Sequence, residues 1–308
     1  MISRRNIRIK VMQTLYTYSS SEQQISKEQA LRLLDKKLDE SRQLFVFLVY
    51  FLTEVARYAE TDARQRASRH ITTEEDLNVN TKIAGNELLW KILELPSYQT
   101  ALQETKPSLK ETGEWVKKMY LQLVQSEAYQ EYVAVPARDK KQERAILEFI
   151  FTDLMLPNED FLAEVIEENY MHWDDDGEMM SLLMMNFLSK PHTYDFQQFI
   201  GKEKNTFARD LLISVIDKEA MCNELIHAKL QNWDPERTAL LDMIMMRMGI
   251  CEFLYFETIP PKVTINEYID LAKQYSTPQS GHFVNGILDT IHKELAQAGK
   301  LVKTSFKK

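Results

Sequence analysis

The chain has few of the residues that sheet-rich folds use at their turns. Its 308 residues include only 8 Gly and 9 Pro, fewer than a doubly wound or all-β fold normally needs. Two cysteines are too few for a disulfide scaffold or a zinc-ribbon cluster. The longest apolar run, residues 44–52, is far shorter than a membrane span, and the arginines at the N-terminus precede no apolar signal region. We therefore expect a cytoplasmic protein without a membrane segment.

The helical period dominates the residues that are present. Ile7, Val11 and Leu15 mark one face of a first helix, with Ser3 as its N-cap, and residues 26–29 form a capping box before a second helix. Residues 44–52 are apolar on all sides, which indicates a fully buried segment. No turn signals bound this segment, so a helix is favoured over a strand, although a buried strand stays possible. The pattern predicts an all-α protein.

The last third of the chain has the clearest pattern. A stripe through Leu240, Ile244 and Met248 predicts a helix that Pro260 and Pro261 end. The residues after this pair, 264–267, form a capping box that predicts the start of the next helix. A final apolar stripe over 284–295 predicts the last helix, and we expect the basic residues after it to form a frayed tail.

The net charge of −8 argues against nucleic acid, but the charge is unevenly distributed. Residues 1–20 carry four basic and no acidic residues, and residues 204–308 are neutral. Residues 21–203 carry −12 and hold all the excess acid. A basic end can still bind phosphate if the acidic middle is held away from it.

Sequence motifs for catalysis or metal binding are missing. The chain contains no Walker loop, no G-x-G-x-x-G and no H-E-x-x-H. Glu168 and His172 are four residues apart and could begin a metal site, but no second such pair follows, and a solvated acidic face explains them better. We therefore expect no enzyme activity, no metal and no cofactor.

Two segments at opposite ends carry a family resemblance. The first is the string RRNIR at 4–8, which continues as QTLY at 13–16. The second is IPPKVTINE at 259–267, which continues through LAK at 271–273 into SGHFVNGILD at 280–289. Together they resemble the NusB family of transcription antitermination factors. Family members have about half this length, so the middle of the chain looks like an insertion.

The resemblance implies an all-helical fold of two small bundles, enlarged here by a helical insertion. It divides the chain into residues 1–40, which begin the NusB-like core, an acidic insertion at 41–203, a C-terminal bundle at 204–300 and a basic tail at 301–308. It also implies binding of boxA-type single-stranded RNA from ribosomal RNA operons. The implied protein partners are the ribosomal protein NusE and the RNA polymerase antitermination complex, and we expect the helix 237–255 and the one before it to present part of the NusE surface.

The same resemblance places the RNA surface on both ends of the chain. Arginines entering the first helix can reach phosphates, and exposed aromatic rings can stack on bases. The expected RNA-binding residues are Arg4, Arg5, Arg8, Tyr16, His282, Phe283 and Asn285. Gly286 lies inside the last predicted helix, where glycine is unfavourable, and we favour close helix packing as the reason for it. The chain departs from the family at Gln279, where an acid is common, and at His282, where the family has lysine; both changes bear on RNA preference.

Two alternatives stay open. A scaffold of the same fold could have lost RNA binding, which RNA affinity and its dependence on salt would reveal. An RNA-modifying enzyme, such as a methyltransferase with a domain of this kind, is the second alternative. Such an enzyme needs a glycine-rich strand–loop–helix, which the eight scattered glycines do not provide.

Overall fold

The computed structural model describes residues 2–107, 112–170, 173–230 and 238–304, and these residues are helical without a strand. The all-α prediction is confirmed. The chain divides into two compact units. One comprises residues 3–38 with 200–308, and the other comprises residues 39–199 together with the N-terminal end. Each unit is described below on its own.

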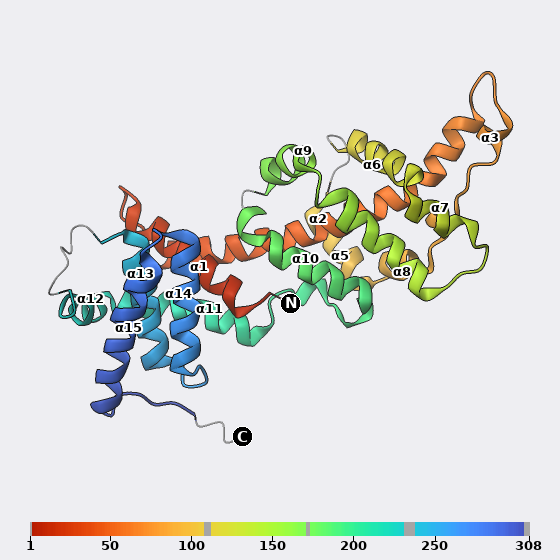
Figure 1. The fold of residues 1–308 in the computed structure, drawn as a ribbon. Coiled ribbons are helices and arrows are strands. Elements are labelled where there is room, and N and C mark those ends of the chain that lie inside the picture. The colour runs from red at the N-terminus through yellow and green to blue at the C-terminus, as the bar shows by residue number, and fades with distance from the viewer. Residues whose placement is uncertain (1, 108–111, 171–172, 231–237, 305–308) are drawn as a thin grey trace. The chain divides into compact units, whose positions relative to one another are not determined.

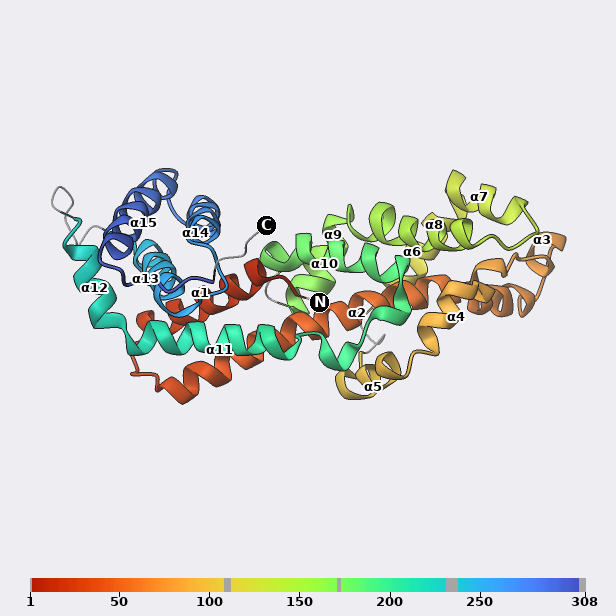
Figure 2. The ribbon, with the colours of Figure 1, turned by 90° about the horizontal axis from the view of Figure 1, so that it is seen from below.

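The first unit combines the two ends of the chain. Its helices are α1 (Arg4–Ser20), the first part of α2 (Lys27–Ala67), α11 (Lys202–Asp217), α12 (Glu219–His227), α13 (Leu240–Tyr255), α14 (Pro261–Tyr275) and α15 (Ser280–Gln297). Helices α13, α14 and α15 lie side by side in both ribbon views (Figures 1 and 2) and contact one another, while α1 packs on α11 and α13.

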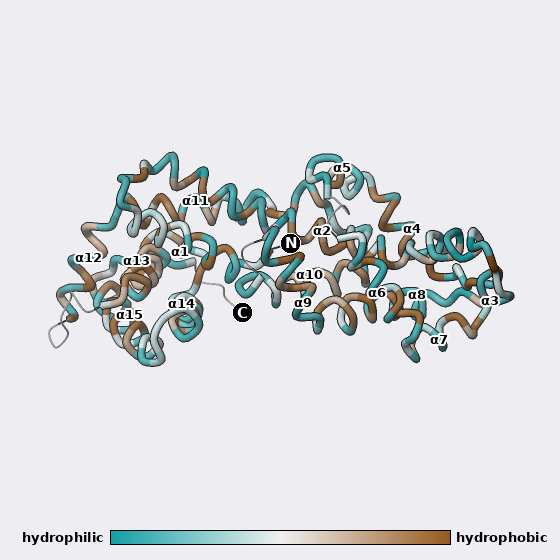
Figure 3. Tube along the Cα trace, turned by 90° about the horizontal axis from the view of Figure 1, so that it is seen from above, coloured by the Kyte–Doolittle hydropathy of each residue, from teal (hydrophilic) through white to brown (hydrophobic). Residues whose placement is uncertain are grey.

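Helix α13 is the centre of this unit because it is apolar on nearly every side. Figure 3 shows hydrophobic residues along it, and only Leu240, Leu241, Arg247, Leu254 and Tyr255 are more than slightly exposed. Gly249 permits a close approach from α15: a Cβ there would lie 2.9 Å from Leu288 Cδ2. The expectation that α13 presents a docking surface does not fit this burial, and Arg237, where that surface was to begin, lies outside the described residues.

Local signals set the starts of α1, α2 and α14 in this unit. Ser3 Oγ accepts a hydrogen bond from Asn6 N (3.1 Å), and the Ser26–Gln29 capping box forms with Ser26 N donating to Gln29 Oε1 (2.7 Å). The start expected at 264–267 is wrong. Helix α14 begins at Pro261, since the fixed φ of proline suits the first helical position, and Thr264 is buried one turn later.

The tail is also better ordered than expected. Lys303 Nζ donates to the backbone oxygens of Glu252 and Phe256, each at 2.8 Å, and Thr304 N donates to Glu257 O (3.1 Å). Lysine thereby gives a second donor to two carbonyls at the end of α13 that already accept backbone N–H groups. The tail is thus pinned to α13 as far as Thr304, and residues 305–308 lie outside the described part.

The second unit is built along the rest of α2. Its other helices are α3 (Glu74–Leu77), α4 (Glu87–Leu93), α5 (Pro96–Thr105), α6 (Gly113–Gln125), α7 (Glu127–Ala134), α8 (Lys140–Phe149), α9 (Glu159–Phe161) and α10 (Trp173–Ser189), with π-helical turns at Ile150–Met155 and Leu162–Glu167 and 3₁₀ turns at Lys82–Gly85, Pro191–Thr193 and Phe196–Gln198. Residues 44–52 are helical and mostly buried within α2, which excludes a strand. Phe45 stacks on Phe196 with ring centroids 5.5 Å apart.

No helix in the described ranges is long and apolar enough to cross a membrane. These ranges also hold no group of three or more His, Cys, Asp or Glu side chains that could bind a metal ion. The Glu168–His172 pair was considered above as the start of a metal site, and His172 lies outside these ranges.

Candidate RNA-binding surface

The arginines that enter α1 have three different environments. Arg4 is partly exposed, and its Nη2 lies 2.6 Å from Glu203 Oε1 on α11. Arg5 is also partly exposed and donates from Nη2 to Gln274 Oε1 on α14 (3.0 Å). Arg8 is 2% exposed. The first two can exchange these contacts for phosphate at little cost, because exposed ion pairs and hydrogen bonds contribute at most about 1 kcal/mol.

Arg8 belongs to a buried polar network on α13 and α14. Its guanidinium makes a two-pronged contact with Glu252, Nε to Oε1 at 2.7 Å and Nη2 to Oε2 at 3.0 Å. The same carboxylate accepts from Tyr268 OH (2.7 Å) and Thr264 Oγ1 (3.0 Å), and Glu267 lies 3.3 Å from Arg8 Nη1. The expectation that Arg8 reaches phosphate does not fit this placement, because its donors face the buried carboxylate of Glu252 and the partly exposed one of Glu267.

The electrostatics of the network follow from its burial. Desolvation would lower the pKa of Arg8, but hydrogen bonding to and the charge of Glu252 hold it above its ordinary value. Burial, and next the charge of Glu252, raise the pKa of Tyr268 well above its ordinary value. The network is therefore a charged Arg–Glu pair with a neutral phenol that donates to it, and it ties α1 to α13 and α14.

The start of α15 is held by hydrogen bonds and close packing. Ser280 Oγ donates to Asp242 Oδ2 (2.7 Å) at the beginning of α13. At Gly281 a Cβ would lie 2.8 Å from Lys273 Cγ, so only glycine lets α15 lie this close to the last turn of α14. This anchoring leaves His282 and Asn285 exposed and Phe283 half-buried.

The last turn of α14 joins the two predicted parts of the surface. Arg5 is hydrogen-bonded to Gln274, and Gly281 of α15 packs on the neighbouring Lys273. The guanidinium of Arg5 and the start of α15, which carries Phe283, therefore contact consecutive residues of one helix. Tyr16 is 45% exposed on α1, about three helical turns beyond Arg5.

Gly286 has a different environment from the one expected. It is exposed in the middle of α15, and a Cβ there would meet nothing within 4 Å. Close helix packing therefore does not explain this glycine. The open space lies one residue after Asn285 and one turn after Phe283, on the part of α15 that the RNA prediction names.

Sequence reasoning missed Glu252 as the organiser of this region. The signal was present, because an acid within the apolar string ICEFLYF at 250–256 needs a buried partner. Lys10, completely buried on α1, was likewise counted as surface charge. The exposed positive charge of the first helix therefore comes from Arg4 and Arg5.

The two units differ in charge. Residues 3–38 and 200–308 hold 22 basic and 17 acidic residues, a net charge of +5. Residues 39–199 hold 16 basic and 29 acidic residues, a net charge of −13. The excess acid of the chain thus lies in one compact unit, and the unit with the exposed arginines is basic.

These features define an all-helical protein with a basic unit, on which Arg4, Arg5 and Tyr16 are at least partly exposed, and an acidic unit. Comparison with known proteins identifies the family. The NusB family model matches residues 177–293. A transcription antitermination protein NusB of Salinibacter ruber is 32% identical over 154 residues, 49% of this chain and 89% of that protein. The chain belongs to the NusB family.

A second relative agrees. The transcription antitermination protein NusB of Methylacidiphilum infernorum is 35% identical over 134 residues, which cover 43% of this chain and 89% of that protein. The solved structure of T. maritima NusB is 36% identical over 37% of this chain and 78% of its own length, with a TM-score of 0.31. Each of these matches leaves at least half of the present chain without a counterpart.

Proposed function

We propose that this protein is an RNA-binding transcription antitermination factor that acts on boxA-type single-stranded RNA of ribosomal RNA operons together with NusE. The relatives that this chain matches are transcription antitermination proteins, which supports the antitermination role. The observation that carries the RNA role is the anchoring of Arg5 and the start of α15 on one turn of α14. A cation beside exposed polar and aromatic side chains suits a single strand, whose bases are free to stack.

The surface residues have distinct roles in this proposal. Arg4 and Arg5 contact phosphates, next to the positive end of the α1 dipole. Phe283 and Tyr16 offer rings to bases, and His282 and Asn285 offer hydrogen bonds to base edges or ribose. Arg8 acts indirectly, because its ion pair with Glu252 fixes the helix from which Arg4 and Arg5 project.

The test is fluorescence anisotropy with a labelled boxA-like single-stranded RNA over a salt series, with and without NusE. We expect Arg5→Gln to weaken binding and to reduce the salt slope by roughly one counterion. Arg64→Gln is the control, because it removes the same charge from an exposed position in the acidic unit. No binding under any condition, with NusE included, would overturn the proposal and leave the scaffold alternative. Tight RNA binding with an affinity that does not change with salt concentration would also contradict it.

A further inference from the structure

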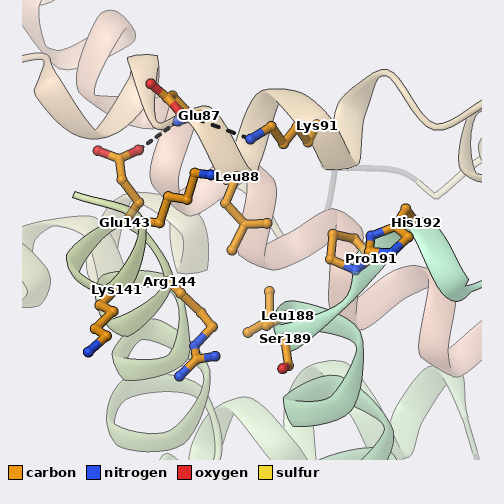
Figure 4. A pocket seen from close by; sticks show the side chains of 11 residues that line it. Glu87, Leu88, Lys91, Lys141, Glu143, Arg144, Leu188, Ser189, Pro191 and His192 are labelled. Atoms are coloured by element: carbon orange, nitrogen blue, oxygen red, sulfur yellow. Dashed lines mark hydrogen bonds and ion pairs between the residues drawn. The ribbon is translucent and has the colours of Figure 1, made fainter. Parts of the chain in front are cut away.

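The acidic unit contains a pocket that the RNA proposal does not use. It has a volume of about 430 Å³ and lies among α4, the start of α8, the end of α10 and the turn Pro191–Thr193 (Figure 4). Pockets that hold small organic ligands typically measure about 300–1,000 Å³. The pocket is therefore large enough for a small molecule.

The charge of the pocket is opposite to that of its unit. Four basic residues line it, Lys91 from α4 and Lys140, Lys141 and Arg144 from α8, against the acids Glu87 and Glu143. The lining thus carries +2 in a unit of −13. Since random placement in so acidic a unit would favour acids, this concentration of cations points to an anionic ligand.

Glu143, one of the two acids in the lining, is already satisfied by the protein. The Glu143 carboxylate is almost fully buried; it accepts from Tyr132 OH (2.9 Å) and Glu87 N (2.6 Å), and Arg138 Nη1 lies 3.1 Å away. Its negative charge is therefore balanced by Arg138, which is not one of the residues that line the pocket. The other acid, Glu87, lies 3.9 Å from Lys91 Nζ.

The cations of α8 are available to a ligand. Lys140 and Lys141 are the first two residues of α8 and are exposed, and their ammonium groups make no ion pair among the residues that the structure describes. Arg144 follows one turn later, with Nε 3.1 Å from Glu148 Oε1. Arg144 is four residues from Lys140 and three from Lys141, so it is a neighbour of each on the surface of α8. The positive end of the helix dipole adds to the attraction of an anion.

The remaining lining is apolar. Figure 4 shows Leu88 and Leu188 between the basic side chains of α8 and the pair Pro191 and His192. An inorganic ion would leave this apolar surface against water, whereas a ligand with an organic body would cover it. We propose that this pocket binds a small phosphate monoester with an apolar or aromatic body. The charge of such a group, about −1.5 to −2 at neutral pH, matches the +2 of the lining.

The proposal can be tested by isothermal titration calorimetry on the full chain with three probes: phenyl phosphate, inorganic phosphate and phenol. We expect phenyl phosphate to bind at least about tenfold more tightly than inorganic phosphate, because only it fills both parts of the pocket. Phenol lacks the charge and should not bind measurably.

The double variant Lys140→Gln/Lys141→Gln should weaken phenyl phosphate binding at least about tenfold without changing the melting temperature, since both side chains are exposed. Lys117→Gln/Lys118→Gln removes the same charge from α6 in the same unit and should leave affinity unchanged. Equal affinity for phenyl phosphate and inorganic phosphate would overturn the proposal. Equal weakening by both double variants, or no binding of phenyl phosphate, would overturn it as well.

Discussion

Arg8 and Glu252 are 244 residues apart in sequence, yet they form a two-pronged ion pair in the core of the basic unit, with Arg8 Nε 2.7 Å from Glu252 Oε1. A charge pair of this kind needs every donor and acceptor filled, because each ion has lost its water. Tyr268 and Thr264 fill the remaining sites of the carboxylate. The pair joins a helix from one end of the chain to a helix from the other.

Breaking this pair should be costly. We expect Glu252→Gln to lower the free energy of unfolding by about 3–5 kcal/mol, because it leaves the Arg8 charge buried without its partner. Glu203→Gln, which breaks the exposed pair with Arg4, is the control and should cost at most about 1 kcal/mol. Chemical denaturation followed by circular dichroism measures both. Similar losses of unfolding free energy in the two variants would show that the buried pair stabilises the protein no more than the exposed pair.

The phenol in the network predicts a response to alkaline pH. The folded-state pKa of Tyr268 is raised by burial and by Glu252, so above pH ~10 the unfolded chain releases this proton while the folded chain keeps it. Stability is therefore fully present below that pH and falls as the pH rises. In Tyr268→Phe this part of the pH dependence should disappear, at the cost of one hydrogen bond to a charged acceptor, about 1.5–3 kcal/mol. Identical pH slopes for the two proteins would contradict this.

The variant Phe283→Ala distinguishes a base-stacking role of this ring from a role in packing the core. If its half-buried ring stacks on a base, Phe283→Ala should weaken RNA binding by ~1–3 kcal/mol and leave the salt slope unchanged. A core role would instead lower the free energy of unfolding by about 3–5 kcal/mol. We expect the effect on affinity to be the larger one. Anisotropy and thermal unfolding on the same variant decide between them.

Gly286 offers a test in which stability and binding move in opposite directions. Gly286→Ala should stabilise the protein by about 0.5–1 kcal/mol, since alanine is the better helix former and its Cβ meets nothing within 4 Å. The same methyl group should weaken RNA binding if the strand approaches this part of α15. Gly249→Ala is the contrasting variant: its Cβ would meet Leu288 at 2.9 Å, and it should destabilise by about 1–3 kcal/mol. If RNA affinity is unchanged in Gly286→Ala, this glycine is not part of the RNA surface.

Local chemistry made much of the fold predictable. The periodic stripes, the Ser3 cap and the Ser26–Gln29 box are all short-range signals, and each appears in the structure as predicted. The start of α14 was misplaced because two signals competed within four residues. Pro261 already has the backbone angle of a first helical residue, so it took precedence over the cap at Thr264.

The sequence by itself determined that this protein is helical, that its excess acidic charge lies in the middle and that its two ends carry the NusB pattern. All three can be read locally, because composition, period and motif are properties of neighbours along the chain. Only the tertiary structure decided which cations are exposed. Arg4 and Arg5 reach water while Arg8 and Lys10, on the same helix, do not. For Arg8 the difference depends on Glu252 of α13, which is remote in sequence. A charged side chain is buried when folding supplies its partner, and no local pattern records where that partner will lie.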